Sequence, residues 1–312
     1  MRPHNLLLGL TLLATNAAAG ELHVFTSDAS GFNTHSVWYD DGQEVTVFDT
    51  QFTPQYAQLL IDNIRRETGS PITRVIITHP NPDKFNGIAA FREIDTEIIA
   101  SATTAEAMPG VDEYKRHFLV NVAQMFSAED YPVLQTVDTT FSGRLEIMLN
   151  SGETITLFEL PAGISSTQTV ARIDATGDLI VGDLIHSNTH AWLEGGIVNG
   201  QAVPEVDSWK DVLATLNTLG TGTAYGGRGD FLPVVEAVEQ QTAYLTRAVE
   251  IVDDYIESLG DQRSELSDAE KQAEHYAAIQ ARFVEAFPSY GQPELVGFSV
   301  YGLVHQRLTA AP

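Results

Sequence analysis

The sequence contains no cysteine, so no disulfide bond stabilises the fold and a cysteine nucleophile is excluded. Basic residues are also scarce: 17 lysines and arginines stand against 42 aspartates and glutamates, which gives a formal net charge of −25 at pH 7. A surface with this charge repels phosphate backbones and anionic lipid headgroups. We therefore expect neither a nucleic acid nor a membrane as a partner.

Long hydrophobic runs are missing as well. After residue 19, no stretch reaches the roughly 18 uncharged apolar residues that a transmembrane helix needs. Before it, Arg2 and an apolar run over 6–13 are followed by the small residues Ala17, Ala18 and Ala19. This order is typical of a signal peptide over 1–19 and predicts a mature protein that is periplasmic or secreted. A buried N-terminal helix is the alternative, but the segment does not alternate polar and apolar residues at the helical period.

Motifs of other chemistries are absent too, because the chain has neither a Gly-x-Ser-x-Gly elbow nor a Gly-x-Gly-x-x-Gly loop after a strand. What is present is a chain of 312 residues, 43% of them hydrophobic, without any biased tract. That length and composition allow a sizeable core. No linker or repeat divides the chain. We expect one domain over 20–312, of which 230–312 form a helical C-terminal extension.

The hydrophobic pattern predicts short strands early in the chain, mixed elements in the middle and helices at the end. Strands are expected at 22–26, 36–39, 45–49, 75–77, 97–100, 145–149, 154–160, 169–173 and 179–181. Helices are expected at 54–67, from 88, and at 114–126, 209–219, 232–258 and 269–287. This order is typical of an α/β fold with two packed sheets.

One predicted strand runs directly into a cluster of polar residues. The strand over 75–78 is followed by His79-Pro80-Asn81-Pro82-Asp83-Lys84 and, shortly after, by Gly87. This run resembles the signature of the metallo-β-lactamase superfamily, in which a strand ends in His-x-His-x-Asp-His. Further partial matches follow in the family's order at Asp49, Gly163-Ile164, Gly182-Asp183 and Gly226-Gly227-Arg228-Gly229, so the resemblance covers roughly residues 21–235.

The resemblance implies a four-layer αββα sandwich of the metallo-β-lactamase type, here with extra C-terminal helices. In that family, loops at one edge of the paired sheets hold one or two metal ions, usually zinc, which activate a water molecule for hydrolysis. This chain keeps three of the family's ligand positions as His79, Asp83 and Asp183. The other four are changed, to Asn81, Lys84, Ile164 and Arg228.

Two of the changed positions carry positive charge. Two carboxylates buried without a cation are costly, and Lys84 and Arg228 can offset the charges of Asp83 and Asp183. We therefore expect a salt-bridged second site without metal. His79 alone remains as a good nitrogen ligand at the first site, so the cofactor is either none or one weakly bound divalent metal, zinc if any. Alternatively, Lys84 points to solvent, and Arg228 clamps a substrate carboxylate or lies on the surface.

A pair of histidines follows Asp183 in the sequence. His186 and His190 are four residues apart, so they could replace lost metal ligands if the segment were helical. Asn188 and the glycines after Trp192 indicate a loop instead. In that case His186, His190 and Trp192 are expected to line the cleft and to contact a substrate.

Two functions remain open from the sequence. The first, toward which we lean, is a hydrolase-like enzyme acting on a small anionic molecule or on an ester, lactone or amide, with His79, Asp83 and Asp183 as its catalytic residues. The second is a non-catalytic relative that keeps the fold and the cleft. It would bind an anionic small molecule or a partner through Lys84, Arg228, His79 and Trp192.

Overall fold

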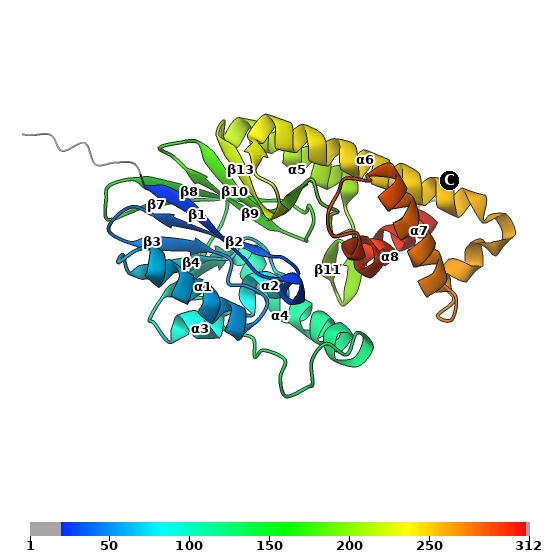
Figure 1. Cartoon of the computed structure of the whole chain (residues 1–312), viewed down its shortest axis with the longest axis horizontal. Helices are drawn as coiled ribbons and strands as arrows, with labels where there is room; N and C mark the ends of the chain where they lie inside the picture. Colours follow the sequence, from blue (N-terminus) through cyan, green and yellow to red (C-terminus); the bar gives the residue numbers. More distant parts are fainter. Residues whose placement is uncertain (1–19, 310–312) are drawn as a thin grey trace, which may run out of the picture.

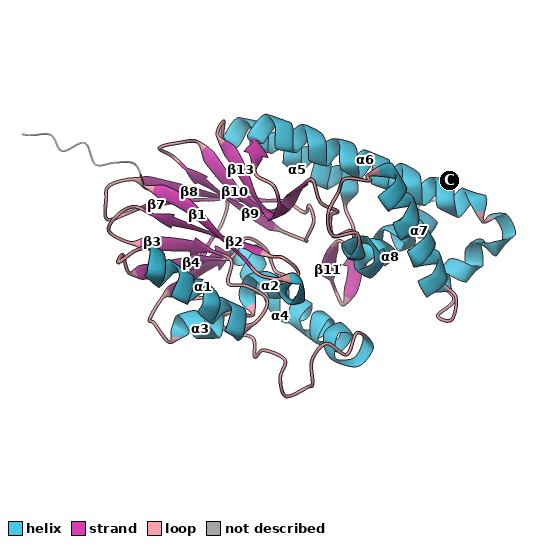
Figure 2. Ribbon diagram, in the orientation of Figure 1, coloured by secondary structure: helices cyan, strands magenta, loops and turns pink. Residues whose placement is uncertain are grey.

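The computed structural model describes residues 20–309, so the predicted signal peptide lies outside the described residues. Two six-stranded sheets form the centre of the molecule, with helices on their outer faces (Figures 1 and 2). The four-layer αββα sandwich expected from the sequence is therefore confirmed. Among the described residues, no helix combines the length and the apolar character needed to cross a bilayer.

The first sheet follows the order of the sequence. Its strands are β1 (Glu21–Thr26), β2 (His35–Asp40), β3 (Val45–Phe48), β4 (Ile72–Ile76), β5 (Glu97–Ser101) and β6 (Thr139–Phe141). The pairs from β1 to β3 are antiparallel and those from β3 to β6 are parallel. Its outer face is covered by α1 (Pro54–Glu67), α2 (Pro82–Phe85), α3 (Ile88–Arg92) and α4 (Ala102–His117) (Figure 1).

The second sheet has the order β14-β13-β10-β9-β8-β7. Its strands are β7 (Arg144–Met148), β8 (Thr154–Leu160), β9 (Gln168–Ile173), β10 (Asp178–Ser187), β13 (Thr223–Gly229) and β14 (Leu232–Pro233). Its outer face carries α5 (Val206–Leu219) and α6 (Val234–Ser258), and a small hairpin is formed by β11 (Gly196–Val198) and β12 (Gln201–Val203). Beyond α6 the chain forms a 3-10 segment (Gly260–Ser267), α7 (Gln272–Ala286) and α8 (Glu294–Thr309), which lie together at one end of the molecule (Figure 1).

Alternation along the strands sorts the apolar side chains into separate layers. In β2, Val37 and Tyr39 join the core between the two sheets, whereas Trp38 between them packs under the helices. In β4, Val75 and Ile76 divide in the same way. Successive side chains of a strand point to opposite faces, so both faces of these strands are buried. Packing on both faces thus fixes the end of β4, from which the chain leads into the candidate site.

The structure differs from the predicted elements in three places. The helix expected at 114–126 begins at Ala102, because Ser101 caps it, and continues through the breakers Pro109 and Gly110 before a π-helical turn at Phe118–Val122. The run Gly226-Gly227-Arg228-Gly229, for which no strand was predicted, lies in the strand β13. The helix α8 was not predicted, because its apolar residues surround the whole helix and leave no helical periodicity.

Candidate functional site

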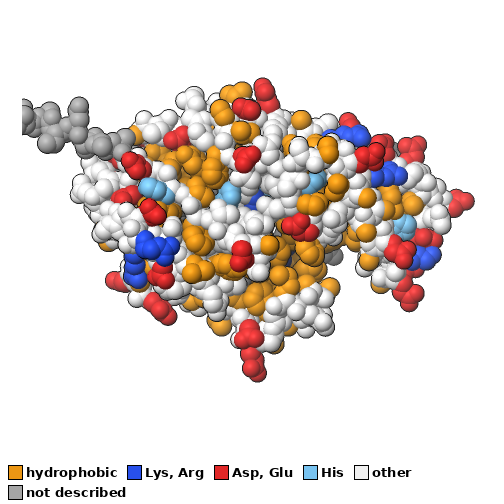
Figure 3. Space-filling view, viewed as in Figure 1, with side chains coloured by type: hydrophobic (Ala, Val, Ile, Leu, Met, Phe, Trp, Pro, Cys, Tyr) orange, Lys and Arg blue, Asp and Glu red, His pale blue; other side chains and the backbone are white. Residues whose placement is uncertain are grey.

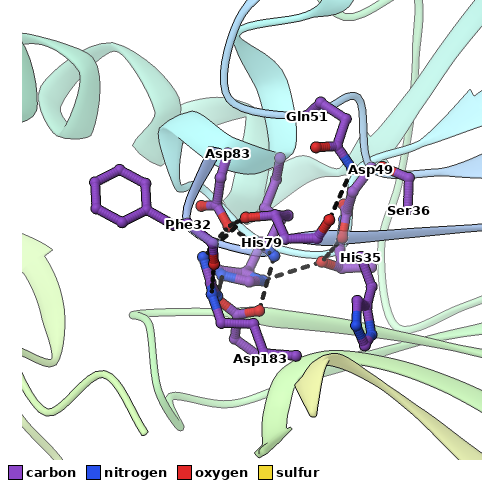
Figure 4. A network of polar contacts seen from close by, with 12 residues as sticks. Phe32, His35, Ser36, Asp49, Gln51, His79, Asp83 and Asp183 are labelled. Atoms are coloured by element: carbon purple, nitrogen blue, oxygen red, sulfur yellow. Dashed lines mark hydrogen bonds and ion pairs between the residues drawn. The ribbon is translucent and has the colours of Figure 1, made fainter. Parts of the chain in front are cut away.

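Four charged side chains from three elements meet at one place, and Figure 4 labels two of them, Asp83 and Asp183. The short helix α2 carries Asp83 and Lys84, β10 carries Asp183, and β13 carries Arg228. The parallel pairing of β10 with β13 brings Asp183 and Arg228 onto neighbouring strands. We call these four residues the central network.

Distances within the central network are those of close ion pairs, and all of them except the contact between Lys84 and Asp83 are also hydrogen bonds. The ammonium of Lys84 lies 2.7 Å from Asp183 Oδ1 and 2.9 Å from Asp83 Oδ2. The guanidinium of Arg228 lies 2.7 Å from Asp183 Oδ2 and 2.9 Å from Asp83 Oδ2. All four residues are buried, and Lys84 is 0% exposed, so it does not point to solvent. Two positive charges thus stand against two negative charges at one place.

The neighbouring backbone approaches the central network closely and contributes to holding it in place. A Cβ atom at Gly227 would lie 1.8 Å from Asp183 Oδ1, so only glycine allows β13 to approach the carboxylate. Arg228 also donates hydrogen bonds to the carbonyl of Phe32 and to Thr34 Oγ1, each at 3.0 Å. The guanidinium is therefore held by the segment between β1 and β2 as well as by the carboxylates. Sequence reasoning did not identify Phe32 and Thr34, because no motif spacing marks them.

The pKa values follow from burial and pairing. Burial raises the pKa of Asp183, but the Coulombic attraction of Arg228 and Lys84 outweighs it and holds that pKa well below its usual range. The same balance lowers the pKa of Asp83. The carboxylates in turn raise the pKa of Lys84 despite its burial. The central network is therefore fully ionised at neutral pH and its formal charges sum to zero.

His79 and Asp49 lie beside the central network in a different state. Asp49 accepts hydrogen bonds from the amide and from the hydroxyl of Thr78, both at 2.8 Å, and burial raises its pKa to about 7. Burial lowers the pKa of His79 to about 4, so its imidazole is neutral at pH 7. His79 Nδ1 lies 3.0 Å from Thr78 Oγ1, and Nε2 lies 3.7 Å from Asp183 Oδ2 without a hydrogen bond to any described residue.

Comparison with protein families identifies the chain. The family model described as "Metallo-beta-lactamase superfamily" matches residues 29–228. The chain belongs to the metallo-β-lactamase superfamily. This match ends at Arg228, so α6, α7 and α8 lie beyond the part of the chain that the superfamily model describes.

Solved structures support the same fold. A metallo-β-lactamase from Pontibacter korlensis superposes with a TM-score of 0.56 at 14% identity, covering 74% of this chain and 97% of that one. A structure of TMB-1, described for its substrate and inhibitor binding, superposes with a TM-score of 0.53 at 20% identity, covering 74% of this chain and 99% of that one. The search of curated proteins found no match.

The residues at this superfamily's metal positions do not fit zinc. Zinc ligands need a free lone pair, whereas the Lys84 ammonium and the Arg228 guanidinium have none. Those two cations already bind the carboxylates that would hold a metal, and the side chain of Ile164 has no donor atom. Within residues 20–309, no three His, Cys, Asp or Glu side chains are grouped so that they could hold a metal ion. We therefore assign no chemical step of this protein to zinc.

A pocket opens directly beside the central network, with a cavity volume of about 60 Å³. Its polar floor contains Asp83, Asp183, Arg228 and Asn81. Its walls are mainly aromatic and aliphatic and are formed by Phe32, Phe52, Phe118, Leu119, Ala123, Met125, Trp192 and Phe298, together with Pro82 and Lys115. Trp192 lines the pocket, and its contact with a ligand stays a prediction.

The structure places His186 and His190 elsewhere. Strand β10 continues through Ser187 and Asn188 has a φ of 56°, so the two histidines do not share a helical turn. His186 lies opposite Arg228 in the strand register, and burial lowers its pKa to about 3. The ring of His190 packs among four aromatic rings, those of Tyr244, Phe283, Phe287 and Tyr290. Neither histidine is among the pocket residues.

A second buried ion pair lies in the wall of the pocket, and the sequence analysis missed it. Lys115 of α4 binds Glu194, which also accepts hydrogen bonds from Trp192 Nε1 at 2.9 Å and from the hydroxyl of Tyr301 in α8. The Lys115 ammonium lies 4.9 Å from the centroid of the Trp192 ring. We call Lys115, Glu194, Tyr301 and Trp192 the wall network. Lys115 and Tyr301 are each far from Trp192 and Glu194 in the sequence, and no motif spacing connects them.

Proposed function

We propose that this protein is a ligand-binding member of the metallo-β-lactamase superfamily in which the central network replaces the metal ions, and that metal-assisted hydrolysis is not its activity. One observation carries the proposal. The Lys84 ammonium lies 2.7 Å and 2.9 Å from the two carboxylates that would otherwise bind a metal. A metal could enter only if this cation left, and a buried cation without its partners is costly.

Charge balance supports binding over hydrolysis. A hydrolytic water needs a metal ion or a base that can take its proton. Asp83 and Asp183 are held ionised by two cations each, so their pKa values are too low for a base at neutral pH. Burial lowers the pKa of His79 to about 4. Asp49, whose pKa burial raises to about 7, is buried and is not among the residues that line the pocket. The aromatic pocket, by contrast, needs no chemistry to hold a molecule.

The metal content of the purified protein tests the first half of the proposal. We expect far less than one zinc per chain by elemental analysis, no heat of zinc binding by calorimetry, and an unchanged melting temperature after treatment with a chelator. The double variant Lys84→His, Arg228→His restores the family's ligand types at two positions and should gain zinc affinity that the parent lacks. Near-stoichiometric zinc in the parent, lost with stability on chelation, would refute the proposal.

Hydrolysis is the alternative, and a small panel of substrates tests it. p-Nitrophenyl acetate, γ-butyrolactone and a chromogenic β-lactam represent ester, lactone and amide. We expect hydrolysis at the rate of the buffer with or without added zinc. A rate above the buffer that is lost in the Trp192→Ala variant, which changes the pocket but not the central network, would assign hydrolysis to this pocket and contradict the proposal.

We also propose that the chain is exported. The supporting observation is the order of residues 1–19, with Arg2, the apolar run over 6–13 and the small residues up to Ala19. Expression of the full chain in a bacterium, followed by fractionation and N-terminal sequencing, should give a product in the periplasm or medium that begins at Gly20 or within a few residues of it. A product that still begins at Met1 would reject export by cleavage.

A further inference from the structure

We propose that the pocket selects an uncharged, largely apolar molecule that presents a hydrogen-bond donor to the floor, rather than the anionic molecule that was one of the ligand classes expected from the sequence. This inference rests on the proposed binding function for the site itself. It concerns the class of ligand, and its test does not depend on whether a metal is bound.

The floor of the pocket offers no free positive charge. Of the two cations in the central network, only Arg228 lines the pocket, and its guanidinium donates to both carboxylates, to Thr34 and to the Phe32 carbonyl. An anion entering here would have to compete with two aspartates that are already in place. Such a competition replaces one ion pair with another and leaves an aspartate buried without a partner, which is unfavourable.

The wall offers no free positive charge either. Lys115 is the other cation that lines the pocket, and its ammonium is bound by Glu194 and lies over the Trp192 ring. Each cation of the lining is thus matched by a carboxylate, one in the central network and one in the wall network. The whole chain carries a formal charge of −25, which repels an approaching anion further. Acidic side chains are spread over the visible face in Figure 3.

The remaining lining favours an apolar body. Phe32 packs edge-to-face on Phe52 and on Trp192, with centroid distances of 4.9 Å and 6.4 Å. Phe118 and Leu119 extend this surface. At the rim, Met125 and Phe298 are 44% and 45% exposed, so apolar surface continues from the pocket to the solvent. Apolar molecules that bury such a surface gain free energy without any charge partner.

One polar group of the floor remains able to accept a hydrogen bond. The hydrogen bonds and ion pairs that the described residues make to Asp83 all reach its Oδ2 atom, which leaves Oδ1 as an acceptor beside the pocket. The side chain of Asn81 lines the pocket next to it and makes no capping hydrogen bond to α2. A hydroxyl or amide N–H of the ligand can therefore be satisfied at the floor, while a carboxylate would face Asp83 as a like charge.

Binding of four matched naphthalene probes tests the selection. They are 2-naphthalenemethanol, 2-naphthoate, 2-naphthylmethylammonium and 2-methylnaphthalene, measured at pH 7.5 by calorimetry and by ligand-observed NMR. The alcohol should bind at least about tenfold tighter than the carboxylate, because a carboxylate loses its hydration without gaining a cation. It should also bind tighter than the ammonium, which meets Arg228 and Lys115, and tighter than the methyl compound, which has no donor. Trp192→Ala should weaken all four.

The probes also define the result that overturns the inference. The inference is refuted if 2-naphthoate binds as tightly as 2-naphthalenemethanol or tighter. It is also refuted if no probe shows binding that the Trp192→Ala substitution weakens. Either result leaves the metal measurements unchanged, so a failure of the ligand class is distinguished from a failure of the proposed metal-free centre. Stoichiometric zinc would refute the proposed function whatever the order of the probes.

A variant of the wall network should weaken the preference of the pocket for an uncharged ligand over an anion. Glu194→Gln leaves Lys115 without its carboxylate and so frees one positive charge in the lining. Affinity for 2-naphthoate should then rise about tenfold while that for 2-naphthalenemethanol stays nearly constant. Tyr301→Phe is the matched control, since it removes a hydrogen bond to Glu194 but keeps the ion pair, and it should not change the order. An unchanged preference in a folded Glu194→Gln variant would contradict the inference; if the variant does not fold, the order of the probes in the parent decides.

Discussion

The central network and the wall network are two buried sets of charges that border the same pocket, and they differ in what they connect. The central network joins α2, which packs on the first sheet, to β10 and β13 of the second sheet. All of its residues lie within the segment that the superfamily model matches. The wall network joins α4 to α8, which lies beyond that segment. The central network lies entirely within the matched segment, whereas the wall network is completed by Tyr301 from the C-terminal extension.

The two networks also differ in how many charges they balance. Four charges are paired crosswise in the central network, so removing one cation leaves two carboxylates short of a partner. The wall network holds one ion pair, and neutral groups of Trp192 and Tyr301 complete the shell of Glu194. The comparison indicates that the central network contributes more to stability, while the wall network sets the charge of the pocket.

Removing the C-terminal helices should have the largest effect, because it removes Tyr301 from the wall network together with much of the core. A chain that ends at Gly229 lacks α6, α7 and α8, which supply about half of the core residues under the second sheet, including Leu245, Val252, Phe283 and Val300. We expect this truncation to yield no folded protein, because the part of that sheet's outer face that α5 does not cover would be exposed to water. Circular dichroism and a cooperative melt would check it. A soluble truncation with a cooperative transition would show that the extension is dispensable for folding.

Lys84→Ala should have the next largest effect. It leaves Asp183 and Asp83 buried with one cation fewer, which we expect to lower the free energy of unfolding by about 3–5 kcal/mol. Urea denaturation measures the change. Arg247→Ala is the control, because its ion pair with Glu250 is exposed and should contribute less than about 1 kcal/mol. Equal effects of the two substitutions would show that the central network is not desolvated.

Glu194→Gln should destabilise the protein less than Lys84→Ala. The amide oxygen still accepts hydrogen bonds from Trp192 and Tyr301, so the loss is confined to the charge partner of Lys115. We expect a decrease of about 1–3 kcal/mol in the free energy of unfolding, measured in the same denaturation series. A cost larger than that of Lys84→Ala would reverse the proposed ranking of the two networks.

The smallest expected effect is the pH dependence of the free energy of unfolding, which comes from two groups beside the central network, His79 and Asp49. Burial lowers the pKa of His79 to about 4, so between pH 6.5 and 4 the unfolded chain binds a proton that the folded chain does not. The free energy of unfolding therefore decreases as the pH is lowered through this range. Burial raises the pKa of Asp49 to about 7, so its contribution is full below the unfolded value near 4 and is lost as the pH rises through 7. The two groups therefore oppose each other on acidification.

Asp49→Asn separates these opposing contributions. Between pH 7.5 and 6, the variant should lose about 1 kcal/mol more of its free energy of unfolding than the parent does, because the stabilising uptake of a proton by Asp49 is gone. Denaturation in urea at the two pH values measures this difference. His305→Ala, at an exposed position, is the control and should follow the parent. Parallel curves for Asp49→Asn and the parent would show that Asp49 is already ionised at pH 6.

Much of the fold follows from local patterns. The helix expected over 54–67 is α1 (Pro54–Glu67), where Thr53 caps the first turn, and the strand expected over 154–160 is β8 (Thr154–Leu160). Both carry a clear period and end at residues that stop the element. In contrast, α8 is apolar on all sides and β13 is rich in glycine, so neither shows a period. Their state is decided by the surfaces against which they pack.

The sequence by itself determined the family resemblance, the retained His79, Asp83 and Asp183, and the fact that two ligand positions had become Lys84 and Arg228, because these features depend only on residue type and order. Only the tertiary structure decided which charges meet. Burial of Lys84 between two carboxylates, the approach of Gly227 and the pairing of Lys115 with Glu194 require residues from distant segments. Electrostatic energies depend on distance and desolvation, and these are fixed only when the sheets and the C-terminal helices have packed together.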